Sequence, residues 1–460
     1  MAGWTKLEGL VHEEITQREK EGCTVTGWRE RFQQLPKDDA SVMHFYQELS
    51  ALPADPVLTK NEPNSWEEIQ ATRPRATEKY PLPTSEAVLK DKFQGAWLAR
   101  CIGCALGKPI EAGAFMGGQD GRPGWKNVEL WFRGADAWPI QGYTPGTSRA
   151  TQEFGIDLNT WSDKSKRENL KFMESDDDIR YMVIALGLME EKGLDWTSFD
   201  LGKYWHGHLP YRSVCTAETQ AYLNFAQVTD HYQPQAPSDW PEKLEWVRNY
   251  LNPYREFIGA QIRVDGYAYA AAGNPHLAAN LAWRDASFSH VRNGIYGSMF
   301  LGAAISAAFS LTDPEAIIQA GLDEIPAQCR LTTDIHRAVD IAKKAKNQLD
   351  LAEKVWDAFS HYNPVHTNNN AALCAAAFVF AKNDFEQAIT TSVLGWDTDC
   401  NGASVGSLIG AVLGAKNIPQ KWSAPLNDTL YSEIPNFHPI KISECAERSY
   451  ALFQKHGRES

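Results

Sequence analysis

The chain has 460 residues, of which 43% are hydrophobic and 22% are charged, a balance typical of a folded globular protein rather than a disordered one. Its formal net charge of −13 argues against bulk nucleic-acid binding, because that function needs clustered Lys and Arg side chains. The length allows one large domain or several smaller ones.

The amino-terminal region, residues 1–85, is polar and rich in proline. Its opening sequence, MAGWTKLEGLVHEEITQREKEG, is charged and amphipathic, and no run of 18 apolar residues follows in the chain. We therefore expect neither a secretory signal nor a membrane span, and we predict a cytoplasmic protein. Prolines between residues 50 and 85 disfavour long helices, so the region is predicted to be an extension with a helical start and then an irregular arm.

The composition changes at residue 86, where Ala, Leu, Gly and Cys begin to recur with helical spacing. This pattern predicts a buried helix over 86–106, and the CIGC sequence inside it is expected to hold reduced, structural thiols. Residues 115–173 are rich in Gly, Trp and Pro and predict a loop-rich insertion. The Trp and Tyr residues from Trp125 to Trp161 would either stack on a ring of a ligand or simply pack.

Most of the remaining chain shows apolar residues at three- and four-residue spacing, and few segments alternate with period two. Helices are predicted over 176–193, 274–311, 314–325, 332–347, 368–381 and 402–415. The predicted fold is all-α: a compact, orthogonal multi-helix domain over residues 86–430, followed by a C-terminal tail, 431–460, packed on it.

The first group of acidic residues, in ESDDDIRYMVIALGLM, stands directly before a predicted helix. Ser175, Asp176, Asp177 and Asp178 would cap that helix, because Ser and Asp satisfy free backbone N–H groups at a helix start. One or two acidic residues suffice for a cap, however. Three consecutive aspartates repel one another, and a hard divalent cation offsets that repulsion, so a metal site is the alternative.

The second acidic group lies in GWDTDCNGASVGSLIGAVLGA. Asp397, Asp399 and Asn401 fall on alternate residues of a predicted loop entering a helix, which would point their oxygens to a common side. Two distant acidic groups, each at the start of a helix of small residues, are explained more economically by one shared site for divalent ions than by two over-acidic caps.

Four segments in this order resemble the ADP-ribosylglycohydrolase family over residues 93–425: GAWLARCIGCALGKPIEA, ESDDDIRYMVIALGLM, NPHLAANLAWRDASFSHVRNGIYG and GWDTDCNGASVGSLIGAVLGA. The resemblance implies an all-helical domain with two Mg²⁺ ions at its centre, Mn²⁺ being a possible substitute. It also implies the metal ligands Ser175, Asp176, Asp177, Asp397 and Asp399. Glu111 closes the first motif and is implied as the acid/base, with Asp177 as its catalytic neighbour.

Three further residues are predicted to border the substrate: Asp178, His290 and Asn369. For two of them a structural role stays open, since His290 would also serve as a buried histidine and Asn369, with Asn368 and Asn370, would also cap the next helix. The alternative for these asparagines is to border the pocket together with His366.

The sequence departs from the family's pattern at three positions. Cys104 stands where the family commonly has Asp, Asp178 where many members have Thr, and Cys400 where Thr or Ser often helps to bind the second metal. A thiol is a poor Mg²⁺ ligand, so either water or a backbone carbonyl replaces Cys400 or the second site is weaker.

The resemblance implies a metal-dependent glycoside hydrolase that cleaves an N- or O-linked ribosyl or ADP-ribosyl bond in a small molecule or an ADP-ribosylated partner. One alternative is a related glycosidase acting on a nucleoside-like or simple sugar substrate without ADP. The other is a non-catalytic member of the fold, crystallin-like or ligand-binding.

Overall fold

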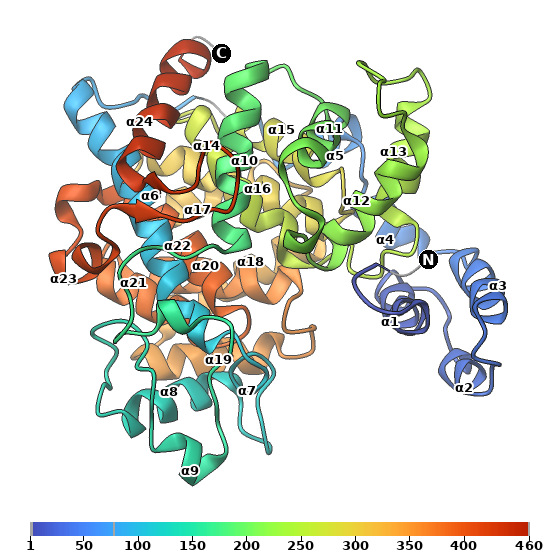
Figure 1. Cartoon of the computed structure of the whole chain (residues 1–460), viewed down its shortest axis with the longest axis horizontal. Helices are drawn as coiled ribbons and strands as arrows, with labels where there is room; N and C mark the ends of the chain where they lie inside the picture. The colour runs from blue at the N-terminus through green and yellow to red at the C-terminus, as the bar shows by residue number, and fades with distance from the viewer. Residues whose placement is uncertain (1–2, 77–78, 459–460) are drawn as a thin grey trace.

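The computed structural model describes residues 3–76 and 79–458, and it is almost entirely helical (Figure 1). Within these ranges there are 24 α-helices and one antiparallel two-stranded sheet, β1 (Thr429–Leu430) with β2 (Ile440–Lys441), in which Thr429 pairs with Lys441. The predicted all-α fold is confirmed. No helix in the described ranges combines the length and the apolar character needed to cross a membrane.

The extension contains five helices, and two of them are short helices within the predicted irregular arm. They are α1 (Leu7–Lys20), α2 (Trp28–Gln33), α3 (Asp39–Ser50), α4 (Pro56–Asn61) and α5 (Trp66–Thr72). Pro56 is the first residue of α4, where a missing N–H costs no intrahelical hydrogen bond. Residues of α1, α2 and α3 form a small hydrophobic core of their own with Ala217, Leu251 and Tyr254 (Figure 1).

The predicted insertion contains a packed helix that its Gly and Pro content concealed. The buried helix α6 (Glu86–Gly107) precedes the insertion, and α7 (Gly113–Met116) lies at its start. The insertion itself contains α8 (Gly124–Gly134) and α9 (Ala150–Phe154). One face of α8 buries Val128, Trp131 and Phe132 in the main core. Prolines and glycines flank α8 rather than interrupt it, which is why the local composition suggested a loop.

Within the described ranges, the remaining fifteen helices form the body of the molecule. Seven of them overlap the predicted ranges, and the other eight were not predicted individually. They are α10 (Asp177–Lys192), α11 (Ser198–His208), α12 (Thr216–Val228), α13 (Trp240–Asn249), α14 (Asp265–Ala270), α15 (Pro275–Ala286), α16 (Asn293–Ala308), α17 (Pro314–Leu322), α18 (Arg330–Lys344), α19 (Gln348–Phe359), α20 (Thr367–Ala381), α21 (Phe385–Ser392), α22 (Thr398–Leu413), α23 (Gln420–Ser423) and α24 (Ile442–Leu452). The predicted helix over 274–311 is two helices, because the chain breaks at Arg292, whose φ is +47°.

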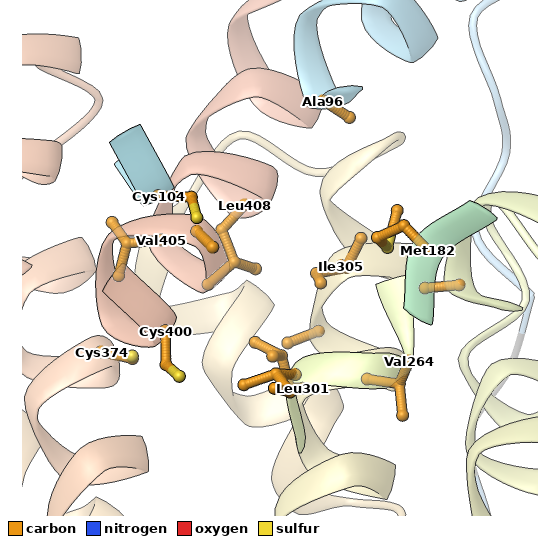
Figure 2. Packing of buried hydrophobic residues seen from close by; sticks show 14 of the residues in the cluster. Ala96, Cys104, Met182, Val264, Leu301, Ile305, Cys374, Cys400, Val405 and Leu408 are labelled. Carbon is orange, nitrogen blue, oxygen red and sulfur yellow. The ribbon is translucent and has the colours of Figure 1, made fainter. Parts of the chain in front are cut away.

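Two central helices, α6 and α22, set the geometry of the molecule. A Cβ on Gly103 would lie 1.9 Å from the carbonyl oxygen of Gly402, and one on Gly107 would lie 2.2 Å from that of Thr398. Only glycine permits such close backbone contact, and this packing offsets its weak helix propensity. Figure 2 shows Cys104 of α6 beside Val405 and Leu408 of α22 in the buried core. The C-terminal end of α6 therefore lies against the beginning of α22.

The C-terminal segment packs on α6. Trp97 of α6 donates from Nε1 to Ser449 Oγ of α24 at 2.9 Å, and both side chains are buried. Each of the eight cysteines is a free thiol, and all but Cys215 are buried.

Candidate functional site

A cavity of about 970 Å³ opens beside the C-terminal end of α6 and the start of α10. Its lining comes from five separate parts of the chain, including the extension and the insertion. These residues are Trp4, Lys108, Glu111, Trp161, Lys164, Phe172, Glu174, Ser175, Asp176, Asp177, Arg180, Cys215, Tyr431, Glu433 and His438. Lys108 and Asp176 are buried, whereas Trp4, Trp161, Lys164, Glu433 and His438 are exposed, so the cavity has an acidic floor and an aromatic rim.

Glu111 reaches the floor because a short 3₁₀ helix, η1 (Lys108–Ile110), turns the chain at the end of α6. The amide of Asn159 fixes this turn: its Nδ2 donates to the carbonyl oxygens of Lys108, at 2.5 Å, and Glu111, at 3.2 Å. Asn159 belongs to the insertion and is buried. The insertion therefore holds the backbone of the implied acid/base, a role that nothing in the sequence indicated.

The SDDD sequence caps α10 through one member, Asp176, while the others line the cavity or turn inward. Asp176 is the N-cap, and its Oδ1 accepts a hydrogen bond from the backbone N–H of Asp178 at 3.0 Å. Its Oδ2 lies 2.8 Å from Lys108 Nζ in a buried ion pair. Ser175 Oγ accepts from Arg180 at 2.8 Å and donates to the carbonyl oxygen of Ser432 at 3.2 Å.

Asp397 and Asp399 lie at the start of α22, but not in the predicted loop. The helix begins at Thr398, so Asp399 and Asn401 are in its first turn and do not share a side. Asn401 turns away instead, and its Nδ2 donates a hydrogen bond to Asn370 Oδ1 at 2.8 Å. The same Asn370 oxygen accepts a second hydrogen bond from the backbone N–H of Asp397 at 3.1 Å. Asn370 of α20 thus connects two helices and holds the Asp397 backbone in place.

Two overlapping groups of side chains offer ligand atoms within 4.8 Å of one another. The first is Cys104, Asp176, Asp178 and Asp399, and the second is Asp397, Asp399 and Cys400, all buried. Within the described residues, the buried oxygens Asp178 Oδ2 and Asp399 Oδ1 have no hydrogen-bond partner. Unpartnered buried carboxylate oxygens are costly, and a bound cation would satisfy them, so these residues fit a divalent metal.

The metal ligands implied by the resemblance are only partly brought together. Asp176, Asp397 and Asp399 belong to the two groups, whereas Asp177 lines the cavity outside them; Ser175 also lines the cavity. Both groups include a thiol, from Cys104 or Cys400, at positions where the family resemblance leads one to expect an oxygen donor. Burial raises the pKa of both thiols well above the ordinary value, which keeps them neutral in the absence of a metal.

The carboxyl groups of the floor strongly perturb one another. Burial, and then the charges of Asp397, Asp176 and Asp177, raise the pKa of Glu111 well above its ordinary value. Burial also raises the pKa of Asp177 to about 7 and that of Asp397 to about 6. Burial acts on Asp176 in the same direction, but Lys108 outweighs it and holds the Asp176 pKa below its ordinary value. Lys108 and Arg180 thus favour the ionised form of Asp176, whereas the other three carboxyl groups are shifted towards their protonated forms.

The three predicted substrate contacts do not line the cavity. Asp178 is buried and pairs with Arg100 of α6, whose NH2 lies 3.0 Å from Asp178 Oδ1. His290 is buried, with Nδ1 2.8 Å from Ser289 Oγ. Asn369 is buried and donates to the carbonyl oxygen of Asn363 at 3.2 Å. The asparagines do not cap α20 either, because His366 is its N-cap and accepts from the N–H of Asn368.

Several lining residues lay outside the sequence prediction. Lys108 belongs to the GKPIE sequence that ends at Glu111, so a lysine directly before Pro109 was the available signal. Arg180 stood one turn into α10, on the face of Asp176. Phe172, Tyr431 and His438 carried no signal, since residues 431–438 join the cavity only through the tertiary fold.

The chain is similar to one known protein family. A family model described as ADP-ribosylglycohydrolase matches residues 85–459. A solved structure titled "ADP-ribosylglycohydrolase-related protein complex" is 20% identical, covers 80% of this chain and 99% of its own, and has a TM-score of 0.48. No curated protein matches the chain. The family match contains the whole acidic floor and leaves out residues 1–84.

Proposed function

The chain belongs to the ADP-ribosylglycohydrolase family, and on that premise we propose that it is a metal-dependent hydrolase of N- or O-linked ribosyl or ADP-ribosyl bonds. The observation that carries the proposal is the floor of the cavity, where Glu111 lies among the charges of Asp176, Asp177 and Asp397. A carboxylic acid with a raised pKa beside ionised carboxylates is the arrangement that glycoside hydrolysis uses.

The metal would be held by the two carboxylate groups, one containing Asp176, Asp178 and Asp399 and the other Asp397 and Asp399. A bound divalent cation of the magnesium type supplies coordination for hydroxyl oxygens and lowers the pKa of a bound water. Ser175 and Asp177 border these groups from the cavity side and are proposed to complete the ligand set.

Glu111 is proposed to move the proton. Burial and its acidic neighbours hold a proton on this carboxyl group, so it can donate to the atom that leaves the anomeric carbon. The surrounding carboxylates stabilise the positive charge that develops on the sugar ring in an oxocarbenium-like transition state. The Asn159 hydrogen bonds keep the Glu111 backbone fixed while its side chain faces the cavity.

One observation favours the narrower alternative, a ribosyl substrate without a diphosphate. Of the Lys and Arg side chains that line the cavity, Lys108 pairs with Asp176, and Arg180 lies 3.8 Å from a Glu433 carboxylate oxygen. Only Lys164 among these lining cations is outside the ion pairs found in the described residues. A single such cation is a modest site for a diphosphate.

The proposal is tested with ADP-ribosylated and simple ribosylated substrates, each assayed with Mg²⁺ and with a chelator. We expect hydrolysis of at least one substrate that stops when the metal is removed. Turnover in the chelator equal to that in Mg²⁺, or failure to hydrolyse any ribosyl bond in the presence of Mg²⁺, would contradict the proposal.

A further inference from the structure

The rim of the cavity holds two tryptophans that the fold does not bury. Trp4 of the extension is 49% exposed, and Trp161 of the insertion is 62% exposed. Exposing so large an apolar side chain is unfavourable, and two of them at one cavity mark a binding surface. Packing, one of the two roles left open for the residues from Trp125 to Trp161, therefore does not apply to Trp161.

We propose that Trp4 stacks, together with Trp161, on a planar aromatic ring of the substrate, and that the extension thereby determines substrate specificity. The inference rests on the proposed function, since it names the part of that substrate that lies at the rim. Trp4 is outside residues 85–459, so this contribution belongs to the extension and not to the part of the chain that the family match covers.

The extension delivers Trp4 to the rim through a defined contact with α12. The backbone N–H of Trp4 donates to Gln220 Oε1 at 2.9 Å, and Gln220 is buried. A Cβ on Gly3 would lie 1.7 Å from the same Oε1 atom, so the chain lies directly against this side chain. Cys215, which immediately precedes α12, lines the cavity. The helix that holds Trp4 therefore starts at the cavity.

The helix that follows Trp4 is also firmly attached. Arg255, which is 3% exposed, donates from NH1 to Glu14 Oε2 at 2.7 Å and from Nε to Glu21 Oε1 at 2.9 Å. Gln17 Nε2 donates to Glu256 Oε2 at 2.9 Å. Breaking one partner of such a buried pair is costly, so α1 has one preferred position on the body of the molecule. Because Trp4 lies only three residues before α1, the fixed position of α1 also fixes where Trp4 lies.

Further aromatic rings continue the surface along the cavity. The rings of Phe172 and Tyr431 have centroids 4.4 Å apart, and those of Tyr431 and His438 are 5.1 Å apart. Lys164 Nζ lies 5.8 Å from the centre of the Phe172 ring. Aromatic side chains bind the π-face of any planar ring, and an adjacent cation adds to the attraction. The rim thus offers aromatic side chains that can bind a planar ring, whereas the floor offers carboxyl groups that can bind a metal and a sugar.

The test compares the binding of ADP-ribose, which carries an adenine ring, with that of ribose 5-phosphate, which carries none, by calorimetry in Mg²⁺. Trp4→Ala should weaken ADP-ribose binding by about fivefold or more, the usual effect of losing one stacking partner, and leave ribose 5-phosphate binding unchanged. Trp4→Phe should retain ADP-ribose affinity within about threefold, because it keeps a ring. Trp161→Ala should give the same ring-selective loss.

Tyr232→Ala is the matched control, since Tyr232 is 87% exposed and does not line the cavity. It should bind both probes as the wild-type protein does. Wild-type affinity of Trp4→Ala for ADP-ribose, or an equal loss for both probes, would overturn the inference. A ring-selective loss in a protein that hydrolyses no ribosyl bond would instead uphold the role of Trp4 and reject the proposed function.

Discussion

The floor and the rim of the cavity are built in opposite ways. Buried carboxyl groups make the floor, on helix ends held together by the close contact of α6 and α22. Exposed rings make the rim, on segments from the extension, the insertion and residues 431–438. The floor accumulates repulsion that only a cation or a proton relieves, whereas the rim exposes apolar surface that only a ligand covers. Chemistry is therefore expected to depend on the floor and selection on the rim.

The largest effect should come from Glu111→Gln, which removes the proton-transfer group and preserves its shape. Turnover should fall by about 10²- to 10⁴-fold, the usual contribution of general acid–base catalysis, while Mg²⁺ affinity changes little. Steady-state rates and metal calorimetry on one preparation separate the two quantities. Glu174→Gln, at another acidic residue of the cavity lining, is the matched control. Near-normal turnover in Glu111→Gln would show that the floor binds without catalysing.

Asp399→Asn should lower Mg²⁺ affinity by about tenfold or more, because Asp399 belongs to both groups of ligand atoms and one lost ligand charge is worth roughly 1.4 kcal/mol or more. Asp176→Asn should act in the same direction, with an added loss of the ion pair to Lys108. Calorimetry compares both with Asp340→Asn, an exposed control on α18. Unchanged metal binding in both floor variants would contradict the view that the floor, and not the rim, binds the metal.

Mg²⁺ should stabilise the protein more at pH 8 than at pH 5. An unfolded Asp titrates near a pKa of about 3.9, whereas the folded pKa is about 7 for Asp177 and about 6 for Asp397. Stability from these raised pKa values is therefore fully present below pH 4 and is lost as the pH rises through 6 to 7. A metal ion binds the deprotonated carboxylates and thereby restores the lost stability. Thermal unfolding with and without Mg²⁺ at both pH values measures the difference, and an equal gain at both would contradict it.

The smallest effect is expected for Cys400→Thr. Sulfur is a soft, poor ligand for Mg²⁺, and threonine offers an oxygen at the same place, so metal affinity should be kept or should rise. The fold should tolerate the change, since the two side chains have similar volumes. Loss of Mg²⁺ binding in a folded Cys400→Thr protein would mean that the thiol, and not the neighbouring aspartates, holds the floor together.

The floor could be predicted from the sequence to a large extent and the rim hardly at all. Helical periodicity gave 86–106 for α6, which spans Glu86–Gly107, because one continuous apolar pattern covers it. The acidic motifs stand at helix starts, and a local sequence pattern is enough to predict a helix start. Asp178 was predicted to border the substrate, but it pairs with Arg100 instead. Local sequence could not indicate this pair, because Arg100 lies on a helix distant in sequence. Trp4 and Tyr431 reach the cavity only through tertiary packing, which no local pattern encodes.

The central claim is that the carboxylate groups of the floor hold a divalent metal beside Glu111. The most direct measurement is a crystal structure of the wild-type protein soaked in Mn²⁺, with anomalous scattering used to locate the ions. We expect Mn²⁺ within bonding distance of Asp399 and at least one of Asp176, Asp178 and Asp397. Ordered Mn²⁺ elsewhere in the cavity, or an empty floor in crystals saturated with Mn²⁺, would contradict it.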